Sequence, residues 1–247
     1  MSLRPTQLAA KRAFDVTLAT MSLIVLSPFL AVIAVLIKAT SRGPVLYRDV
    51  RAGRDGRPFE MMKFRTMIDG ASQLGLGRMV AKDDWRITRV GRFLRRTTLD
   101  EVPQLLNVLK GEMSIVGPRA ATPDQMTRCS DRHRRRLEVR PGMAGWAWIH
   151  GRNNISWSER MELDLWYVDN WSFSLDLKIV ARSFVFLLRG DGIYGPDGVT
   201  TDVMPMPAEG AARTIDLERE TAPAGSGTID LTEEEWAPTE TGARNAS

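Results

Sequence analysis

RRTTLDEVPQLLNVLKGEM, residues Arg95 to Met113, places two adjacent carboxylates at the start of a predicted helix. Proline lacks the backbone N–H that an interior helical position needs, so Pro103 fits only in the first turn and the helix should begin near Asp100. Gly111 is a typical residue just beyond a helix end. Asp100 and Glu101 would then lie at the positive end of the helix dipole and point about 100° apart. One carboxylate is suited to attack a substrate while the other holds a metal.

The same residues also have a purely structural explanation. Thr98-x-x-Glu101 has the spacing of a capping box, in which side chains satisfy the free backbone N–H groups at a helix start. An acidic residue is also ordinary in a first helical turn. The choice between a structural and a catalytic acid pair therefore depends on the rest of the chain.

Charged residues divide the chain into a basic body and an acidic end. Residues 40–140 hold 22 Lys and Arg against 12 Asp and Glu, a net charge of +10, whereas residues 197–247 hold 3 against 11, a net charge of −8. The composition is otherwise that of a globular protein, with 43% hydrophobic residues. Such a body suits a polyanionic partner: a phosphorylated small molecule, an anionic membrane face or nucleic acid.

Few residues are available for disulfide or soft-metal chemistry. The single Cys129 cannot form an intrachain disulfide, which agrees with a reducing compartment. With only His133 and His150, a zinc site is not expected. A bound metal would therefore be a hard cation held by oxygen ligands.

Residues 16–37 form an uncharged, strongly apolar run of 22 residues. At about 1.5 Å per helical residue this run is long enough to cross a bilayer. Ser27-Pro28 near its middle predicts a bend, which favours a re-entrant hairpin over a straight span. Basic residues flank the run on both sides, so the positive-inside rule gives no direction. A spanning helix, a signal peptide and a buried soluble helix are the alternatives.

Basic residues crowd the segment that leads to the acid pair. Residues 43–67 are predicted to form a β-hairpin around a Gly53-Arg54-Asp55-Gly56 turn, and the glycine-rich residues 68–82 a loop that can cover a site. Exposed basic residues are usually only solvated, but several here recur at the spacing of one helix face. After the acid pair, the rigid Gly117-Pro118 dipeptide predicts a fixed presentation of one arginine. The candidates are Lys63, Arg65, Arg86, Arg89, Arg92, Arg95, Arg96 and Arg119.

The C-terminal half combines a basic run, tryptophans and an acidic tail. The basic run at 132–136 is expected to be solvated or attracted to anionic lipid. Five of the chain's seven tryptophans lie within residues 146–171, which predicts core packing or an interfacial belt. Apolar helices are predicted at 157–168 and 175–189. From Pro196 onward the composition predicts disorder, with Thr-Ile-Asp-Leu occurring twice as a docking motif or by chance.

Several short motifs of the chain, and their order, resemble those of the bacterial sugar transferase family. Its members are the monotopic polyprenyl-phosphate phosphoglycosyltransferases that start exopolysaccharide, O-antigen or glycoprotein glycan synthesis. The resemblance runs from about Lys11 to Arg189, and so many ordered motifs favour a catalytic acid pair. The motifs are Lys11-Arg12-x-x-Asp15, Ser27-Pro28, Lys63-Phe64-Arg65-Thr66-Met67, Thr88-Arg89-Val90-Gly91-Arg92-Phe93-Leu94-Arg95, Leu99-Asp100-Glu101-Val102-Pro103-Gln104-Leu105, Gly117-Pro118-Arg119, Arg140-Pro141-Gly142 and Gly151-Arg152-Asn153.

The resemblance implies an architecture of three parts. Residues 1–39 would hold the re-entrant membrane helix hairpin, with its break at Ser27 and Pro28. Residues 40–195 would form a compact α/β (α+β) catalytic unit, held by amphipathic interfacial helices at the cytoplasmic face of the inner membrane. Residues 196–247 would be the acidic disordered tail. Longer relatives carry a large multi-span N-terminal region, so this chain resembles the short form.

The resemblance also implies a reaction: transfer of a sugar 1-phosphate from a UDP-sugar to a polyprenyl phosphate, with release of UMP. By similarity, Asp100 is the nucleophile and forms a covalent aspartyl-phosphosugar intermediate, while Glu101 helps to hold Mg²⁺. The residues expected near the phosphates are Lys63, Arg65, Arg92, Arg95 and Arg119. One departure is Ala120, which stands where the family commonly has a second proline after the arginine.

A second class of function also fits the charge pattern. A membrane-tethered adaptor, or an inactive scaffold, would bind anionic lipid or nucleic acid through the basic body and a partner through the tail. This alternative does not explain why adjacent acids follow Arg95. The enzyme interpretation expects no nucleic acid. The sequence leaves open which sugar is transferred, whether the chain forms a homo-oligomer and what the tail binds.

Overall fold

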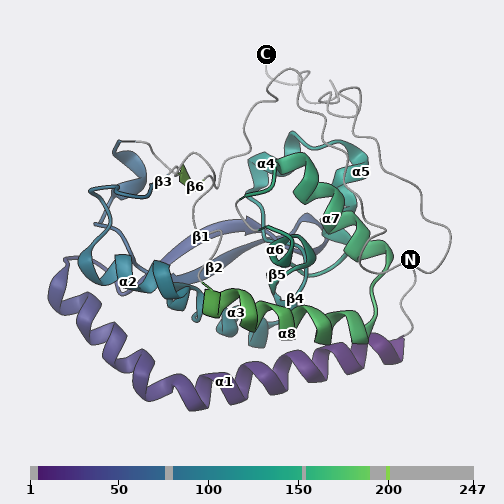
Figure 1. Ribbon diagram of the computed structural model, residues 1–247, viewed down its shortest axis with the longest axis horizontal. Coiled ribbons are helices and arrows are strands. Elements are labelled where there is room, and N and C mark those ends of the chain that lie inside the picture. Colours follow the sequence, from purple (N-terminus) through teal and green to yellow (C-terminus); the bar gives the residue numbers. More distant parts are fainter. Residues whose placement is uncertain (1–4, 76–79, 152–153, 190–198, 201–247) are drawn as a thin grey trace.

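One long helix, α1 (Pro5–Thr40), runs along one side of the other elements in the computed structural model (Figure 1). The structure describes residues 5–75, 80–151, 154–189 and 199–200. By length and composition α1 is able to cross a membrane. Large apolar side chains on it are uncovered by the other described residues: Val25 is 73% exposed and Ile24 67%. The predicted apolar segment is therefore a helix whose surface suits contact with lipid.

Helix α1 bends near its middle but stays helical through Ser27 and Pro28 (Figure 1). Pro28 has no N–H to offer the carbonyl of Ile24, four residues earlier. The Ser27 hydroxyl donates to that carbonyl instead, at 2.8 Å. The predicted break is thus a bend in which a side chain replaces one backbone hydrogen bond. The two arms diverge from the bend and do not lie side by side (Figure 1), and the re-entrant insertion stays a prediction.

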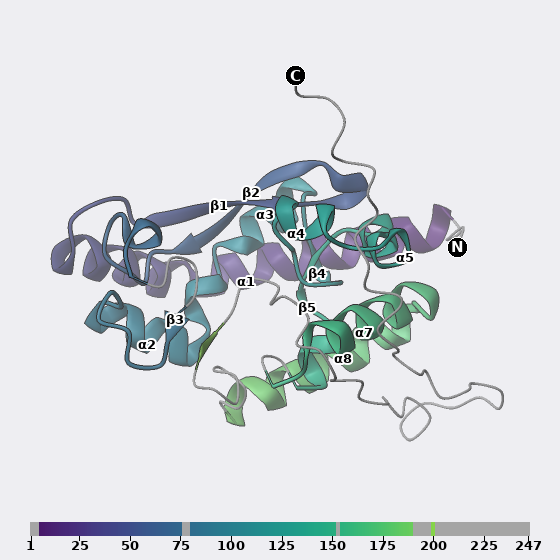
Figure 2. The ribbon, with the colours of Figure 1, turned by 90° about the horizontal axis from the view of Figure 1, so that it is seen from above.

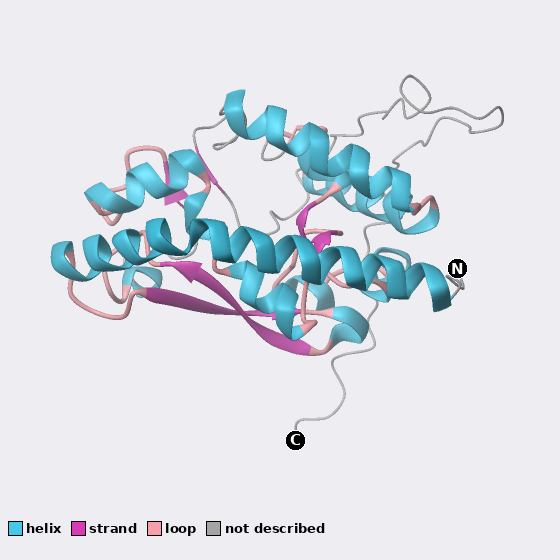
Figure 3. Ribbon diagram, turned by 90° about the horizontal axis from the view of Figure 1, so that it is seen from below, coloured by secondary structure: helices cyan, strands magenta, loops and turns pink. Residues whose placement is uncertain are grey.

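The hairpin predicted for residues 43–67 is confirmed. Strand β1 (Leu46–Ala52) pairs antiparallel with β2 (Pro58–Phe64), with Leu46 opposite Phe64. A short 3₁₀ turn, Arg54–Gly56, joins them, and Gly56 has a φ of 73°, which favours glycine. From above and from below, the hairpin lies on one side of α1 and α8 (Phe173–Arg189) on the other (Figures 2 and 3).

Two short helices flank the acid pair. Helix α2 (Arg89–Thr97) begins where the Thr88 hydroxyl accepts a hydrogen bond from the Gly91 N–H. Helix α3 (Gln104–Lys110) ends at Gly111, which has a φ of 84°, as predicted for a glycine at this position. The short strand β4 (Ser114–Val116) follows and pairs in parallel with β5 (Gly142–Ala144).

Among the remaining helices, α8 packs on both β4 and β5, whereas α4 (Pro123–Thr127) packs on β1. At the start of α7 (Trp157–Asp169), Ser156 and Glu159 form the predicted capping box. The largest apolar core packs α3, β4, α6, α7 and α8 together with part of α1, and Val108 and Ile179 within it are completely buried. The shorter elements are α4 (Pro123–Thr127), α5 (Asp131–Arg134), α6 (Trp146–Ile149) and the 3₁₀ turns Ala71–Gln73 and Arg135–Glu138.

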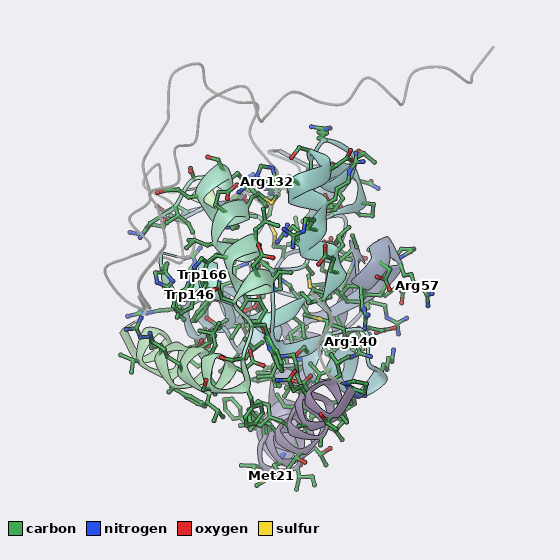
Figure 4. All side chains as sticks on the ribbon, turned by 90° about the vertical axis from the view of Figure 1, so that its right-hand side faces the viewer. Met21, Arg57, Arg132, Arg140, Trp146 and Trp166 are labelled. Carbon is green, nitrogen blue, oxygen red and sulfur yellow. The ribbon has the colours of Figure 1, made fainter. Side chains whose placement is uncertain are left out.

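The tryptophan-rich segment contributes to the protein interior, as the core-packing alternative predicts, and the interfacial belt stays a prediction. Trp146 and Trp171 are buried. Trp146 stacks on Trp166 with ring centroids 4.6 Å apart, and the two lie together between α6 and α7 (Figure 4). The basic run at residues 132–136 forms ion pairs with helix α7: Arg132 pairs with Glu162 and Arg136 with Asp164. These groups hold the C-terminal helices together and are not a free basic surface.

The part of the predicted tail that the structure describes is ordered, contrary to the prediction. Strand β6 (Val199–Thr200) pairs antiparallel with β3 (Val80–Ala81). Strand β3 lies near the end of residues 68–82, which were predicted to form a loop. Both repeats of Thr-Ile-Asp-Leu fall outside the described residues, as does Arg152-Asn153. The predicted disorder beyond Thr200 stays a prediction.

Candidate active site

Asp100 and Glu101 lie on a single 3₁₀ turn, Leu99–Glu101, between α2 and α3. The predicted helix start near Asp100 is therefore wrong, because α3 begins at Gln104. Thr98, whose φ of 59° lies in the left-handed region, separates this turn from α2. Thr98 makes no side-chain capping bond to this turn, so the capping-box explanation of the acid pair also fails. Such a conformation is rare for threonine and costs free energy, and functional sites are where it is often found.

Glu101 is held by two cations from different elements. Lys63 Nζ on β2 donates to Glu101 Oε1 at 2.9 Å, and Arg119 Nη2, just after β4, donates to the same oxygen at 3.2 Å. The Glu101 side chain is 12% exposed and that of Arg119 is 36% exposed. The carboxylate is thus fixed between two positive groups, one of which reaches toward solvent.

Asp100 has a different environment. Burial and the adjacent Glu101 carboxylate raise the pKa of Asp100 to about 6, while the positive charges of Lys63 and Arg95 act in the opposite direction. The ion pairs described at this turn end on Glu101 and not on Asp100. At neutral pH Asp100 is therefore mostly ionised and is destabilised by its surroundings, which is the state of a reactive carboxylate.

Arg95 is positioned beside the acid pair by the segment after β2. Its Nε donates to Thr66 Oγ1 at 2.9 Å, and its Nη2 approaches Met67 Sδ at 3.4 Å. Gly91, one turn earlier on α2, packs directly on Thr66: a Cβ there would lie 1.9 Å from the Thr66 carbonyl oxygen. The glycine allows α2 to approach closely enough for Arg95 to face Asp100.

Two of the predicted phosphate-binding arginines lie elsewhere. Arg65 is buried and donates through Nη2 to Ser41, at the end of α1, while its Nε and Nη1 have no hydrogen-bond partner among the described residues. Arg92 is exposed on α2. Arg86, from the same basic series, is buried in an ion pair with Asp84 and supports the preceding loop. The acid pair is thus contacted by Lys63 and Arg119, with Arg95 close by, and the roles of Arg65 and Arg92 stay predictions.

The donor set at this turn fits a cation that takes most of its ligands from phosphate and water. No group of three or more His, Cys, Asp or Glu residues within the described ranges is arranged to hold a metal. Mg²⁺ commonly binds through one or two carboxylates together with substrate phosphates. Glu101 and Asp100 supply such carboxylates, and the alternative ligands of a soft metal are not found with them.

One family accounts for this order of elements and residues. The model of the bacterial sugar transferase family matches residues 6–190. The chain belongs to the bacterial sugar transferase family. The match takes in α1, the acid pair and every predicted site residue, so the resemblance stated from the motifs is confirmed.

Relatives of this transferase include short and long proteins. It is 43% identical over 192 residues to the uncharacterized sugar transferase EpsL of Bacillus subtilis, which covers 78% of this chain and 94% of that protein. It is 37% identical over 207 residues to the exopolysaccharide production protein ExoY of Sinorhizobium fredii, covering 78% of this chain and 92% of the relative.

A third relative is the UDP-glucose:undecaprenyl-phosphate glucose-1-phosphate transferase of Escherichia coli, 44% identical over 188 residues. The match covers 73% of this transferase and 40% of the relative, so the chain spans less than half of that protein. An undecaprenyl-phosphate glucose phosphotransferase of Komagataeibacter xylinus, 42% identical, is covered over 34% of its length.

Three residues of the transferase whose role the sequence did not predict join α1 to the catalytic unit. Arg12 donates to the carbonyls of Val108 and Leu109 at 2.6 and 2.8 Å, and so caps the C-terminal end of α3. Lys11 pairs with the buried Asp176 at 2.6 Å. Asp15 accepts hydrogen bonds from Ser114 Oγ and Ile115 N on β4, both at 3.0 Å. The motif Lys-Arg-x-x-Asp was visible in the sequence. The residues that bind its three side chains lie about 100 positions or more further along the chain, so these contacts could not be inferred.

Proposed function

We propose that this transferase moves a sugar 1-phosphate from a UDP-sugar to a polyprenyl phosphate at the cytoplasmic face of the membrane. The observation that supports it most directly is the asymmetry of the acid pair: Asp100, with its pKa raised to about 6, stands beside Glu101, which Lys63 and Arg119 hold in place. One carboxylate is left reactive while the other is positioned. The named phosphotransferases of Escherichia coli and Komagataeibacter xylinus support the same substrate class.

In the first half of the proposed reaction, a carboxylate oxygen of Asp100 attacks the phosphorus that carries the sugar. The bond from that phosphorus to the bridging oxygen breaks, UMP leaves with the electron pair, and an aspartyl-phosphosugar remains. In the second half, an oxygen of the polyprenyl phosphate attacks the same phosphorus and Asp100 is released. Splitting the transfer into two displacements predicts ping-pong kinetics.

Positive side chains around Asp100 would stabilise the negative charge that develops on the phosphoryl oxygens during the reaction. Lys63, Arg95 and Arg119 are fixed by Glu101, Thr66 and the β4–β5 segment before any substrate binds. Such preorganised charges stabilise a phosphoryl transition state more than mobile ones, because no reorganisation is needed during the reaction. The distance of these groups from Asp100 is set by elements that pack on α1 and α3.

We also propose Mg²⁺ as the cofactor, held by Glu101 together with phosphate oxygens of the donor. The cation would neutralise phosphate charge when the donor is bound. Lys63 and Arg119 hold Glu101 in the orientation needed for this task.

The membrane location follows from the acceptor and from α1. The phosphate of a polyprenyl phosphate cannot leave the bilayer interface, so the active site must lie close to that interface. The exposed apolar surface of α1 lies on one side of the transferase, and that surface would hold the acid pair near the interface (Figure 1). A cytoplasmic orientation of the catalytic unit is part of this proposal.

The test is UMP release by the membrane-embedded protein with Mg²⁺ across a panel of UDP-sugars, with and without polyprenyl phosphate. We expect sustained release only with the lipid acceptor and with one or a few sugars, and no release from Asp100→Asn. Brief incubation with a sugar-labelled donor alone should leave label on the protein and not on Asp100→Asn. If folded, inserted protein releases no UMP from any donor, the proposal fails and the adaptor or inactive scaffold becomes the better explanation.

A further inference from the structure

A hollow lies between the segment that contains β5 and helix α7. Residues 142–145 form one wall of it, and its other lining residues include Arg119, Trp148, Arg160 and Asp164. Its volume is about 40 Å³. A buried water needs roughly 10–15 Å³, so the hollow has room for the edge of a flat ring entering from solvent but not for a whole nucleotide.

Arg119 links this hollow to the acid pair. The residue lines the hollow, and its Nη2 lies 3.2 Å from Glu101 Oε1. Its backbone is held from the other side, because buried Arg136 donates to the Arg119 carbonyl at 2.7 Å. An extended anionic ligand bound to Arg119 could therefore have one end in the hollow and the other end at the acid pair.

Glycines keep the wall of the hollow flat. A Cβ on Gly142 would lie 2.0 Å from the Gly117 nitrogen, and a Cβ on Gly145 would lie 2.6 Å from the Gly117 oxygen. Neither position accepts a side chain without displacing β4 from β5. The glycines therefore let this wall lie close to Gly117, and the partly buried Trp148 provides an aromatic side chain that lines the same hollow.

The polar lining offers a donor and an acceptor close together. Arg160 and Asp164 are four residues apart on α7 and so share one face of that helix. Both are buried, and Arg136 pairs with Asp164, so the carboxylate is fixed in place. A guanidinium beside a carboxylate complements a ring edge that carries a carbonyl oxygen next to an N–H, which is the edge of uracil.

We propose that this hollow binds the nucleoside of the donor, with the base against Trp148 and its polar edge toward Arg160 and Asp164. The diphosphate then passes Arg119 and places the sugar-bearing phosphorus at Asp100. The inference rests on the proposed function in taking a UDP-sugar as the donor, and it adds the place and the residues that recognise the nucleoside.

The test measures binding of UDP and of inorganic pyrophosphate to the full chain in nanodiscs, for the wild type, Trp148→Ala and Trp148→Phe. Loss of a base–aromatic stack weakens binding by roughly tenfold. We expect this loss for UDP in Trp148→Ala, little change for pyrophosphate, and recovery of most of the UDP affinity in Trp148→Phe. Trp85→Ala, at a tryptophan that is 68% exposed and outside the hollow, is the matched control and should bind both ligands as the wild type does.

Two results would overturn the inference. One is a folded Trp148→Ala that binds UDP as tightly as the wild type; the other is an equal loss of UDP and pyrophosphate, which would indicate a general effect on phosphate binding. Kinetics separate this inference from the proposed function. Normal UMP release with an unchanged KM for the donor in Trp148→Ala contradicts the nucleoside site alone. Trp148-dependent UDP binding without any UMP release contradicts the transfer reaction alone.

Discussion

At the scale of single residues, Asp100 and Glu101 show how neighbours of the same chemistry acquire different tasks. Lys63 and Arg119 both contact Glu101, whereas Asp100 experiences burial and the repulsion of Glu101. The motifs of the sequence singled out Lys63, Arg95 and Arg119, and the structure places all three near the acid pair, while their roles stay predictions. The sequence could not place Arg65 against Ser41 at the end of α1, since that contact depends on tertiary packing.

The raised pKa of Asp100 predicts that Asp100→Asn gains stability while it loses activity. An aspartate with a folded pKa of about 6, above the ordinary 3.8, loses stability as pH rises from about 4 to 6 and carries that deficit at neutral pH. Each pKa unit corresponds to about 1.4 kcal/mol, so the neutral amide should raise the free energy of unfolding at pH 7 by an amount on the order of 1–3 kcal/mol. Urea unfolding in detergent at pH 7 and at pH 4 measures the free energy of unfolding of both proteins. The stability gained by Asp100→Asn should be smaller at pH 4. An equal gain at both pH values would show that the raised pKa of Asp100 is not its cause.

The same pKa predicts the pH dependence of the first half-reaction. Only ionised Asp100 can attack, so the rate should rise with pH, reach half its maximum near pH 6 and level off above it. Single-turnover UMP release with donor alone is the suitable measurement, because the acceptor phosphate then adds no titration of its own. A half-maximal pH near 4 would show that Asp100 titrates as an ordinary surface carboxylate.

At the scale of elements, the short helix α3 depends on a residue from α1. The Arg12 guanidinium donates to the carbonyls of Val108 and Leu109, and Arg140 Nε donates to the Gly111 carbonyl at 2.7 Å. These carbonyls are the unsatisfied negative end of a helix of seven residues. The sequence predicted the end of α3 correctly from Gly111, but its start was placed too early, because the first turn after Thr98 is a separate 3₁₀ turn and α3 begins only after Pro103.

Replacing the cap should destabilise the element that carries the acid pair. We expect Arg12→Met to lower the free energy of unfolding by about 1–3 kcal/mol, because charged hydrogen bonds to half-buried carbonyls are lost. Arg57→Met, on the exposed hairpin turn visible in Figure 4, is the matched control and should change it by less than about 0.5 kcal/mol. Thermal unfolding followed by circular dichroism compares the two; equal effects would argue against a capping role.

The junction of α1, α7 and α8 should be more sensitive still. Asp176 is completely buried and accepts from Lys11, from the Tyr167 hydroxyl at 2.7 Å and from the Trp171 indole N–H at 3.1 Å. Asp176→Asn leaves the Lys11 charge without its partner, which typically costs about 3–5 kcal/mol. Asp169→Asn, whose ion pair with Arg135 is largely exposed, should cost no more than about 1 kcal/mol. Similar losses in chemical denaturation would contradict the ranking.

At the scale of the whole molecule, α1 is both the membrane segment and a structural part of the catalytic unit. Its Ala19, Ile33 and Ile37 are buried, while much of its remaining surface is apolar and exposed. The apolar run of α1 was visible in the sequence, whereas the mixed α/β class was implied by the family resemblance. The sequence could not show that the helix continues through Pro28 or that its ends pack on the body, because uniform apolarity carries no directional pattern.

This dual role predicts unequal effects of truncation. Removing residues 1–40 exposes core around α3 and β4 and removes the partner of Asp176, so the remainder should be aggregated or open to limited proteolysis even in detergent. A chain ending at Thr200 keeps the whole matched family segment and should release UMP as the full chain does. A soluble, protease-resistant fragment without α1 would show that the helix is only an anchor.

The anchoring of α1 by Lys11 and Asp176 also sets an order of events during synthesis. The two residues are separated by 165 positions. At translation rates of about 5–20 residues per second, α1 emerges from the ribosome roughly ten to thirty seconds before its partner exists. Through that interval the catalytic unit cannot cover the apolar surface of the helix. We therefore expect α1 to enter the membrane during synthesis, before the catalytic unit folds onto it.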